Sequence, residues 1–520
     1  MKKLTTILTG TAVALTMSAA AARAERGTDG ELKIIYWQAV SILNPYLSGG
    51  TKDVHGSSLV LEPLAKYDET GTMVPALVDE IPTVDNGGVA EDLKSITWTI
   101  SEGLKWSDGT PFTANDVVFT WKYCTAPDGG CQQAEKFTDI ASVEAVDDRS
   151  VKVTYTVPKP FPYGPFVGAE SPVIQEAQFK DCLGPKAPEC TEQNFHPIGT
   201  GPFRVVHFDP GRRLELERAP SYWRPGLPRS RALVFHFGAS PAEIRSGFEA
   251  GRFSIAGEMV PEDVEALRRD PVYASGYREN PSFATYFIAC NVHRGPLADR
   301  ALRRQIAEAI DRPRLARQTL GRLVKPAQGL IPPGLLGYEA ETGSSVAPVD
   351  TPQAGLRDIE LNCLVHSVFL SEYRAYFRRL CETLAVLGIR LKVLEGYHNL
   401  YDLPEPEKKL DLTITRWFGD FPDAHTFCGT LHTREGVFGP LVGSERFDKL
   451  LEKGQVTADP QARHAIYRQI DELIADEACI IPLFHPQTYR FARPEVEGLA
   501  VSHDGPVVAY EELSLRGDEG

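Results

Sequence analysis

The order strand, helix, strand in the second half of the chain most constrains its fold. Ile359–Val365 and Ile389–Leu394 alternate apolar and polar residues as strands do, and Ser371–Leu387 between them has the spacing of a helix. A βαβ unit of this kind implies some parallel sheet. Together with alternating segments such as Ser95–Ile100, the pattern predicts a mixed α/β fold.

The length of the chain, 520 residues, predicts more than one lobe. One hydrophobic core rarely extends beyond about 250–300 residues, so two or more lobes are expected. The clearest helix is predicted at Leu297–Leu320, where Leu302, Ile306 and Ile310 recur every four residues.

The first 24 residues predict export. Met1-Lys2-Lys3 is basic, the stretch from Ile7 to Ala22 is uncharged and mostly small or apolar, and Ala22-Arg23-Ala24 has the form of a signal-peptidase site. The apolar stretch is short for a membrane span, which makes a retained anchor the less favoured alternative. Residues 1–24 are therefore predicted to be a signal peptide, cleaved near Ala24, and the mature protein to be periplasmic.

The charge of the mature chain argues against two classes of partner. Without Lys2, Lys3 and Arg23 it has 52 basic and 70 acidic residues, a formal net charge of −18 with histidine neutral. Such a charge opposes binding to nucleic acid and to anionic membrane surfaces.

Nine cysteines in an exported chain suggest disulfide bonds. Two pairs are close in sequence and bracket turn-rich loops, Cys124 with Cys131 and Cys182 with Cys190. These two bridges are predicted. Free buried thiols are the alternative, whereas zinc is disfavoured because neither spacing matches a ligand pair.

Residues 415–431, TRWFGDFPDAHTFCGTL, bring an acidic residue into an aromatic cluster. The run from Leu410 to Thr415 alternates and predicts a half-buried strand, after which Asp420 follows Trp417 and Phe418. A carboxylate among so much apolar surface is costly unless a cation meets it. Either the protein supplies that cation, as in a structural ion pair, or a ligand does.

Six stretches in order along the chain carry a family resemblance: LVLEPLAKYDETGTMVPALVDEI (59–81), TWTISEGLKWSDGTPFTANDVVFTW (97–121), IGTGPFRVV with LELERAPSYW (198–206 and 214–223), NVHRGPLADRALRRQIAEAIDR (291–312), RWFGDFPDA (416–424) and CIIPLFHPQTYRFARPEVEGL (479–499). Together they resemble the family 5 extracellular solute-binding proteins, which are the dipeptide- and oligopeptide-binding components of ABC importers.

The resemblance implies a two-lobed clamshell of the periplasmic-binding-protein type (class II-like), with an additional inserted subdomain. Lobe I would be discontinuous and lobe II continuous, with the ligand buried between them after a hinge motion. The implied boundaries are 25–60, 201–285 and 491–520 for lobe I, 61–200 for the inserted subdomain and 286–490 for lobe II.

In peptide binders of this family, an acid at the W-x-x-D place accepts the α-ammonium group of the ligand. The match here is Trp417-Phe418-Gly419-Asp420, so the resemblance implies this role for Asp420. Trp417 and Phe418 would form apolar walls, with core packing as their alternative, and Gly419 would let the backbone approach the ligand. A turn or cap is the alternative for Asp420, and that interpretation suits Asp423 better.

The loop Gly49-Gly50-Thr51-Lys52 resembles the family segment that lines the cleft from the first lobe. Its glycines would expose backbone groups to an extended ligand. Lys52, Arg374 and Arg416 are alternatives for meeting a ligand carboxylate, and the sequence does not choose among them. For Lys52, an ordinary solvated surface lysine is the competing interpretation.

Chemistry other than binding has little support in the sequence. A hydrolase would pair Asp420 with Asp423 or Glu435, but no separate nucleophile or oxyanion loop is evident. His425 and His432 are the histidines to consider for nickel or haem, yet no metal-ligand spacing stands out. No enzyme activity, metal or cofactor is predicted.

The sequence thus predicts a monomeric periplasmic protein that captures a small peptide and hands it to an inner-membrane ABC permease. An opine, a sugar or another amine-bearing solute is the alternative ligand. Phe421-Pro422-Asp423-Ala424 lacks the proline often found after the second acid in the family, which leaves ligand length and side-chain preference open.

Overall fold

The computed structural model of the chain describes residues 30–36, 38–68, 72–335, 337–338, 358–397, 400, 403–419, 423–434, 436–457, 459–502 and 507–516. The predicted signal peptide (1–24), Asp420 and Glu435 lie outside the described residues.

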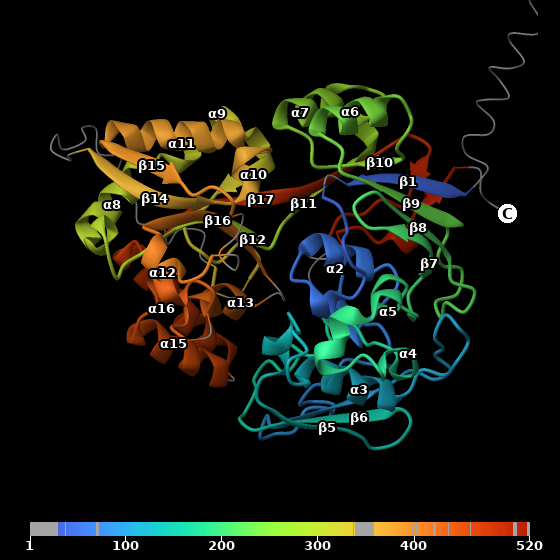
Figure 1. Cartoon of the computed structure of the whole chain (residues 1–520). Helices are drawn as coiled ribbons and strands as arrows, with labels where there is room; N and C mark the ends of the chain where they lie inside the picture. The colour runs from blue at the N-terminus through green and yellow to red at the C-terminus, as the bar shows by residue number, and fades with distance from the viewer. Residues whose placement is uncertain are drawn as a thin grey trace, which may run out of the picture.

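One large mixed sheet extends across the molecule (Figure 1). Its twelve strands run in the order β15-β14-β16-β12-β17-β10-β1-β9-β8-β7, with β11 and β13 also paired to β17. The strands are β1 (Glu31–Tyr36), β7 (Phe203–Asp209), β8 (Arg213–Arg218), β9 (Ala232–Phe237), β10 (Ile255–Ala256), β11 (Tyr277–Pro281), β12 (Ala284–Cys290), β13 (Val324–Pro326), β14 (Ile359–Val365), β15 (Ile389–Val393), β16 (Leu412–Phe418) and β17 (Ile480–Ala492).

Strand β17 belongs to both halves of this sheet. Its first half pairs antiparallel with β12, where Ile288 lies opposite Ile481, and its second half pairs with β11 and β10, where Ile255 lies opposite Ala492. It therefore joins a C-terminal half-sheet (β12, β14, β15, β16) to an N-terminal half-sheet (β1, β7, β8, β9, β10).

The predicted βαβ unit is confirmed. β14 runs parallel to β15, with Ile359 opposite Ile389, and also parallel to β16. The connection from β14 to β15 contains two helices where one was expected, α10 (Ser367–Leu370) and α11 (Arg374–Val386).

The predicted helix Leu297–Leu320 is also two helices, α8 (Arg300–Ala309) and α9 (Arg312–Thr319). Asp311 accepts a hydrogen bond from the backbone N–H of Arg314 at 2.9 Å, and Pro313 stands in the first turn of α9. An acceptor followed by proline is a start signal, so the apolar period continues across a break in the backbone.

Alternate residues of the C-terminal half-sheet enter two different cores, as the two-residue period of a strand requires. On β12, Ile288 joins the core under α8, α9 and α11, whereas Phe287 joins the core under α13–α16. α9 and α11 lie on one side of the half-sheet and α15 and α16 on the other (Figure 1). The helices of the second core are α13 (His425–Cys428), α14 (Gly439–Val442), α15 (Glu445–Val456) and α16 (Pro460–Glu477), with the short α12 (Pro406–Lys409) nearby.

The N-terminal half-sheet follows the same rule. Ile34 belongs to one core and Ile35 to another, which α6 (Pro241–Glu249) and α7 (Pro261–Arg269) cover. α2 (Thr51–Ser57) precedes the part of the chain that leaves this half-sheet. The last strands are β18 (Val496–Glu497) and β19 (Ser514–Leu515), which pair with each other.

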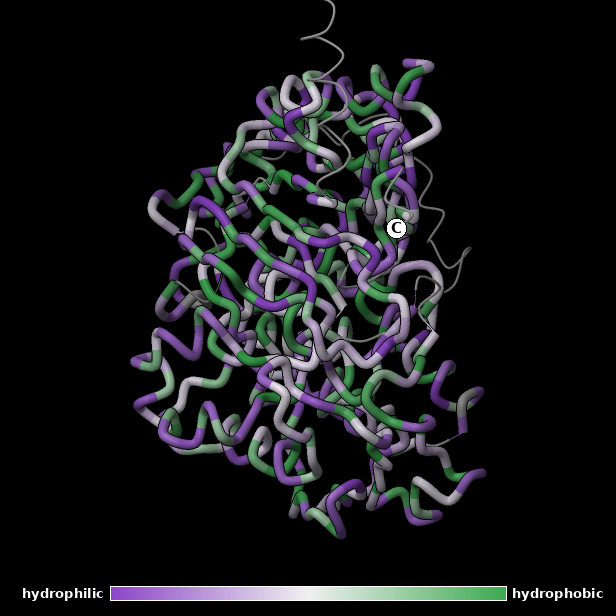
Figure 2. The backbone as a smooth tube through the Cα atoms, turned by 90° about the vertical axis from the view of Figure 1, so that its right-hand side faces the viewer, coloured by the Kyte–Doolittle hydropathy of each residue, from purple (hydrophilic) through white to green (hydrophobic). Residues whose placement is uncertain are grey.

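Residues between α2 and β7 build a separate core around Trp98 and Trp106, both 1% exposed. Its elements are β2 (Ala65–Tyr67), β3 (Met73–Pro75), β4 (Ser95–Thr99), α3 (Ala114–Thr125), β5 (Ile140–Ala145), β6 (Ser150–Tyr155), α4 (Glu176–Phe179) and α5 (Thr191–Phe195). β4, β6 and β5 form a three-stranded antiparallel sheet. Hydrophobic residues are accordingly spread through the whole molecule and not gathered in one region (Figure 2).

Over the described ranges, no helix has both the length and the apolar character that crossing a bilayer requires.

Both predicted disulfides are present. Cys124 is bonded to Cys131 and Cys182 to Cys190, with Cα–Cα distances of 5.2 and 6.0 Å. The five other cysteines are free thiols: Cys290, Cys363, Cys381, Cys428 and Cys479.

We therefore expect five thiols to react with an alkylating reagent when the protein is unfolded without a reductant, and nine after reduction. Intact-mass spectrometry of the two samples measures both numbers. A value of three or one in the unreduced sample would mean that some buried thiols also pair in the exported protein.

Candidate functional site

Strand β16 carries the predicted W-x-x-D segment. It pairs with β12 along its whole length, from Leu412 opposite Cys290 to Phe418 opposite Ala284. The backbone N–H of Gly419 then donates to the carbonyl oxygen of Phe283 at 2.8 Å. This pairing fixes the backbone up to the residue before Asp420, which itself lies outside the described residues.

Trp417 packs in a core, as the alternative interpretation of this residue suggested, and its role as a wall of the ligand site stays a prediction. Its ring lies edge-on to Phe438, with centroids 6.0 Å apart, and packs at the border of a hydrophobic core. Its indole Nε1–H is buried and has no hydrogen-bond partner within the described part of the chain. Since buried donors are normally paired, this group is available to an acceptor.

Arg416 and Phe418 form a second feature of the same strand. They lie on the same side of the strand, because side chains two residues apart share a face. The guanidinium carbon of Arg416 is 4.8 Å from the centre of the Phe418 ring, and Arg416 Nη1 donates to the Tyr286 hydroxyl at 3.0 Å. Both side chains are half-buried.

A buried ion pair on the N-terminal half-sheet lies near this strand. Arg490 of β17 donates from Nη2 to Glu258 Oε1 at 2.9 Å, and it is only 6% exposed. Although burial opposes the charge, the Glu258 carboxylate raises the pKa of Arg490. The Tyr36 ring lies 5.9 Å from the guanidinium, and the Tyr36 hydroxyl is 3.2 Å from Nδ1 of His55 on α2.

Glu372 is a half-buried acid in the turn before α11. Burial and then the charge of Glu258 raise the pKa of Glu372 to about 7, while Arg416 lowers it. Among the described residues no basic group lies within 4.0 Å of its carboxylate. We call Glu258, Glu372, Arg416 and Arg490 the charge cluster.

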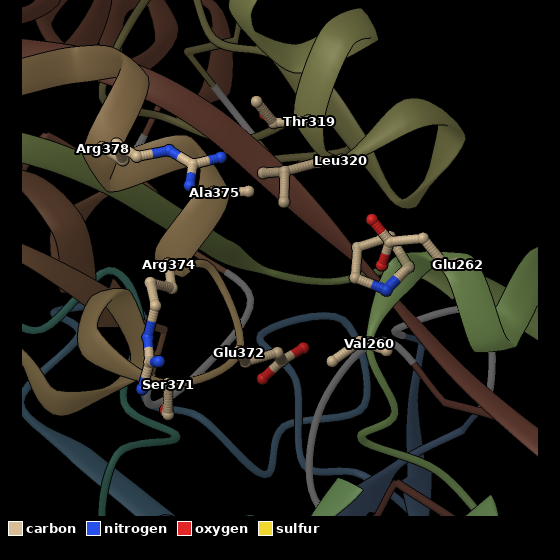
Figure 3. A pocket seen from close by; sticks show the side chains of 10 residues that line it. Val260, Glu262, Thr319, Leu320, Ser371, Glu372, Arg374, Ala375 and Arg378 are labelled. Carbon is tan, nitrogen blue, oxygen red and sulfur yellow. The ribbon is translucent and has the colours of Figure 1, made fainter. Parts of the chain in front are cut away.

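The charge cluster borders a pocket between the two half-sheets. The pocket has a volume of about 230 Å³ and is lined by Val260, Pro261, Glu262, Thr319, Leu320, Ser371, Glu372, Arg374, Ala375 and Arg378. Figure 3 shows the carboxylate of Glu372 directed toward Val260, which belongs to the opposite wall. The first three lining residues lie at the start of α7, and the others come from the end of α9, the turn before α11 and α11 itself.

The loop Gly49-Gly50-Thr51-Lys52 is placed at the start of α2. Gly50 precedes the helix, and Thr51 is the first residue of the helix. Both Gly49 and Thr51 are exposed. Within the described chain, no hydrogen bond or ion pair joins this loop to Trp417, Phe418 or Gly419. The cleft-lining role of the loop stays a prediction.

Lys52 has a partner inside its own loop. Its ammonium group is 2.8 Å from Asp53 Oδ2, and Asp53 is buried at 1% exposure. The same carboxylate accepts hydrogen bonds from the Ser41 backbone at 2.7 Å and the Ser48 hydroxyl at 2.7 Å. Lys52 thus neutralises a structural acid. Of the other two candidates for a ligand carboxylate, Arg374 is exposed and Arg416 belongs to the charge cluster.

Asp423 and the histidines near it have structural partners. Asp423 is 5% exposed and forms a two-pronged ion pair with Arg463 of α16, one contact measuring 2.8 Å. His425 contacts the Tyr467 hydroxyl at 3.0 Å, and burial lowers the pKa of His425 to about 4. Where the chain is described, no group of three His, Cys, Asp or Glu residues is arranged to hold a metal ion.

Sequence reasoning missed Glu258, Glu372 and Arg490. One signal was present for Arg490, because an arginine inside the apolar strand run Tyr489–Ala492 needs a compensating acid. Nothing in the sequence indicated that Glu258 is that acid, since 232 positions separate the two residues.

The comparisons with known proteins identify the class. Residues 72–358 match the middle region of the bacterial extracellular solute-binding proteins, family 5. The match covers more than half of the chain, so the chain belongs to this family, which is one of binding proteins and not of enzymes.

Relatives and solved structures agree with that family. The dipeptide-binding protein DppE of Bacillus subtilis is 20% identical, covering 85% of this chain and 84% of its own, and the dipeptide-binding protein of Escherichia coli is 22% identical, covering 88% and 90%. The structure of Haemophilus influenzae OppA with the peptide RPPGFSPFR has a TM-score of 0.78 at 17% identity, covering 94% of this chain and 99% of that one. A dipeptide-binding protein of a Pseudoalteromonas species, in complex with Met-Leu, has a TM-score of 0.79 at 17% identity, covering 93% and 100%. The predicted α/β clamshell fold is confirmed.

The uncompensated charge of Glu372 predicts a pH-dependent stability. The pKa rises from the ordinary 4.5 to about 7 on folding, so the folded state binds this proton more tightly and loses stability as the pH rises from about 4.5 to 7. We expect Glu372→Gln to raise the free energy of unfolding at pH 8 by on the order of 1–3 kcal/mol, and to change it little at pH 4. Denaturant unfolding at both pH values tests this. A loss of stability at pH 8 would contradict the assigned environment.

Substitution of Asp423, in contrast to that of Glu372, should destabilise the protein. Asp423→Ala leaves the Arg463 guanidinium buried without its partner, and removing one member of a buried pair costs about 3–5 kcal/mol. Thermal unfolding of the unliganded protein should show a markedly lower midpoint. An unchanged midpoint together with lost ligand binding would instead make Asp423 a ligand-contacting acid.

Proposed function

We propose that this protein is a periplasmic solute-binding protein of an ABC importer and that its ligand is a small peptide, held between the two lobes. The observation that carries the proposal is the place of Trp417-Phe418-Gly419. The segment ends strand β16 with an aromatic wall, an unpartnered indole donor and the nearby charge cluster, and it leads directly into Asp420.

Asp420 is proposed to accept the α-ammonium group of the peptide. A charge-assisted hydrogen bond between ammonium and carboxylate is strong where water is excluded. Asp423 is paired with Arg463, which leaves Asp420 as the acid of this segment proposed for a ligand. Relatives with this fold include proteins named for dipeptides and solved with Met-Leu or RPPGFSPFR, which supports a peptide ligand.

Closure of the lobes is proposed to bury the ligand. The lobe boundaries proposed are 25–60, 201–285 and 491–520 for lobe I, with 61–200 inserted, and 286–490 for lobe II. The chain passes between the half-sheets at Ser282–Phe283 and along β17, and these two passages are the proposed hinge. A connection that consists of a small number of chain crossings permits a rigid-body rotation of one lobe on the other.

The remaining parts of the proposal concern export of the protein and delivery of its ligand. Residues 1–24 would be removed on export, and the monomeric protein would deliver its ligand unchanged to an inner-membrane permease, with no nucleic-acid partner. The basic start, the apolar stretch and the signal-peptidase site support export, and a relative in Escherichia coli is named a periplasmic oligopeptide-binding protein.

The decisive experiment compares wild type with Asp420→Asn. Native mass spectrometry of protein purified without refolding detects a co-purified ligand, and a thermal-shift screen covers peptides, opines, sugars and nickel. We expect di- or tripeptides to raise the unfolding midpoint of wild type, because ligands that bind only the folded state stabilise it. The variant should lose that shift while keeping the unliganded midpoint.

Asp358→Asn is the matched control. Asp358 is exposed and pairs with exposed Arg390 at 2.8 Å on the protein surface, so its removal should leave the peptide shift intact. Stabilisation by a sugar or by nickel, unaffected by Asp420→Asn, would overturn the peptide proposal. Recovery of a hydrolysed ligand would overturn the binding-only proposal.

A further inference from the structure

We propose that the pocket between α7 and α11 is a subsite for a basic side chain of the bound peptide, and that Glu372 receives its positive charge. This inference rests on the proposed peptide-binding function and specifies the ligand class further. Of the residues that line this pocket, Arg374 is the one that the sequence suggested for ligand binding.

The walls of the pocket come from both lobes. Val260, Pro261 and Glu262 belong to the start of α7, which covers the N-terminal half-sheet, while Ser371 and Glu372 precede α11 on the other half-sheet. A pocket built in this way exists only when the lobes are close together. Its occupant is therefore in contact with both lobes in the closed protein.

The size of the pocket suits part of a ligand. Its volume of about 230 Å³ lies below the range of roughly 300–1,000 Å³ that is usual for a whole small-molecule site. One long side chain fits such a space, and the aliphatic part of a lysine or arginine would lie against Val260 and Leu320.

The expected charge of the occupant follows from which members of the charge cluster already have a partner in the protein. Glu258 is held by Arg490 at 2.9 Å, so this pair is closed. Arg416 donates to Tyr286 and lies over Phe418, and it is not within 4.0 Å of Glu372. Glu372 is left as the acid of the cluster without a cation in contact. A ligand ammonium or guanidinium group would supply that contact at a half-buried carboxylate, where a charge-assisted bond is stronger than in bulk water.

The arginines of the pocket do not take this role. Arg374 and Arg378 are exposed on α11, and neither forms an ion pair with Glu372. In Figure 3 the Glu372 carboxylate lies between the Arg374 side chain and Val260. Charges in solvent are screened, so these two arginines weaken the subsite less than their number suggests. Glu262, on the opposite wall, adds a second, exposed negative charge.

The test uses peptides that differ only in the charge at the end of one side chain. Lysine peptides, with the lysine first, second or third, are compared with the same peptides containing norleucine, which keeps the chain length and removes the ammonium group. Isothermal titration calorimetry at pH 8 measures each dissociation constant. Wild type should bind at least one lysine peptide about 10- to 100-fold more tightly than its norleucine partner, the range expected of a hydrogen-bonded charge.

Two variants assign the preference to Glu372. Glu372→Gln should remove the lysine preference while keeping the affinity for norleucine peptides. Glu382→Gln, on α11 and in a surface pair with Arg379, should keep both. Equal affinities for lysine and norleucine peptides in wild type, or a preference that survives Glu372→Gln, would overturn the subsite with the peptide function intact. If no peptide binds at all, the proposed function fails and the subsite fails with it.

The pH profile adds a signature that a merely structural role would not show. Burial and Glu258 raise the pKa of Glu372 to about 7, so its carboxylate is mostly protonated at pH 6 and mostly ionised at pH 8. The groups that face it are Glu258, Arg490, Arg416, Tyr373, Tyr489 and the pocket residues Glu262, Arg374 and Arg378.

Of the neighbouring groups, His55 titrates well below this range, since burial and Arg490 lower its pKa to about 3. Affinity for lysine peptides should therefore rise roughly 5- to 10-fold from pH 6 to pH 8 in wild type. Norleucine peptides, and lysine peptides with Glu372→Gln, should show no such rise. A flat profile for lysine peptides in wild type would contradict the role of Glu372.

Discussion

The backbone hydrogen bonds of β17 hold the two ends of the molecule in one sheet. A buried strand must pair its N–H and C=O groups, because an unpaired group away from water is costly. β17 meets this requirement with β12 along its first half and with β10 and β11 along its second. Since the same strand carries Arg490, the pairing that joins the half-sheets also sets the place of the charge cluster between them.

The backbone around the charge cluster is shaped to accommodate a half-buried ion pair. Glu258 has a left-handed backbone, with φ of +59°, a conformation that costs a non-glycine residue about 1 kcal/mol or more. Gly257 before it leaves room for Arg490, because a Cβ there would lie 2.7 Å from Nη1. These two features let one ion pair close, while Glu372 stays without a cation. Charges left unmet in this way are typical of sites that await a ligand.

The contrast between Asp420 and Asp423 illustrates how far sequence reasoning reaches. The strand before them was predictable, because apolar and polar residues alternate from Leu410 to Thr415, and β16 begins and ends within three residues of that run. The alternation carries no information on which acid is already paired. Arg463, which meets Asp423, lies 40 positions away on another element. Likewise, the apolar period of Leu297–Leu320 hid the new helix start at Asp311, because a helix can break without losing its buried face.

The sequence by itself determined the features that depend on neighbours along the chain. These are the βαβ unit, the alternating strands, the two disulfides between cysteines seven and eight positions apart, and the motifs that resemble family 5. The tertiary structure decided which charges meet: Arg490 with Glu258, Arg463 with Asp423 and Lys52 with its neighbour Asp53, with Glu372 left open to the pocket. The physical reason is that local periodicity comes from backbone geometry, whereas the state of a charge depends on burial and on partners that only the folded chain brings together.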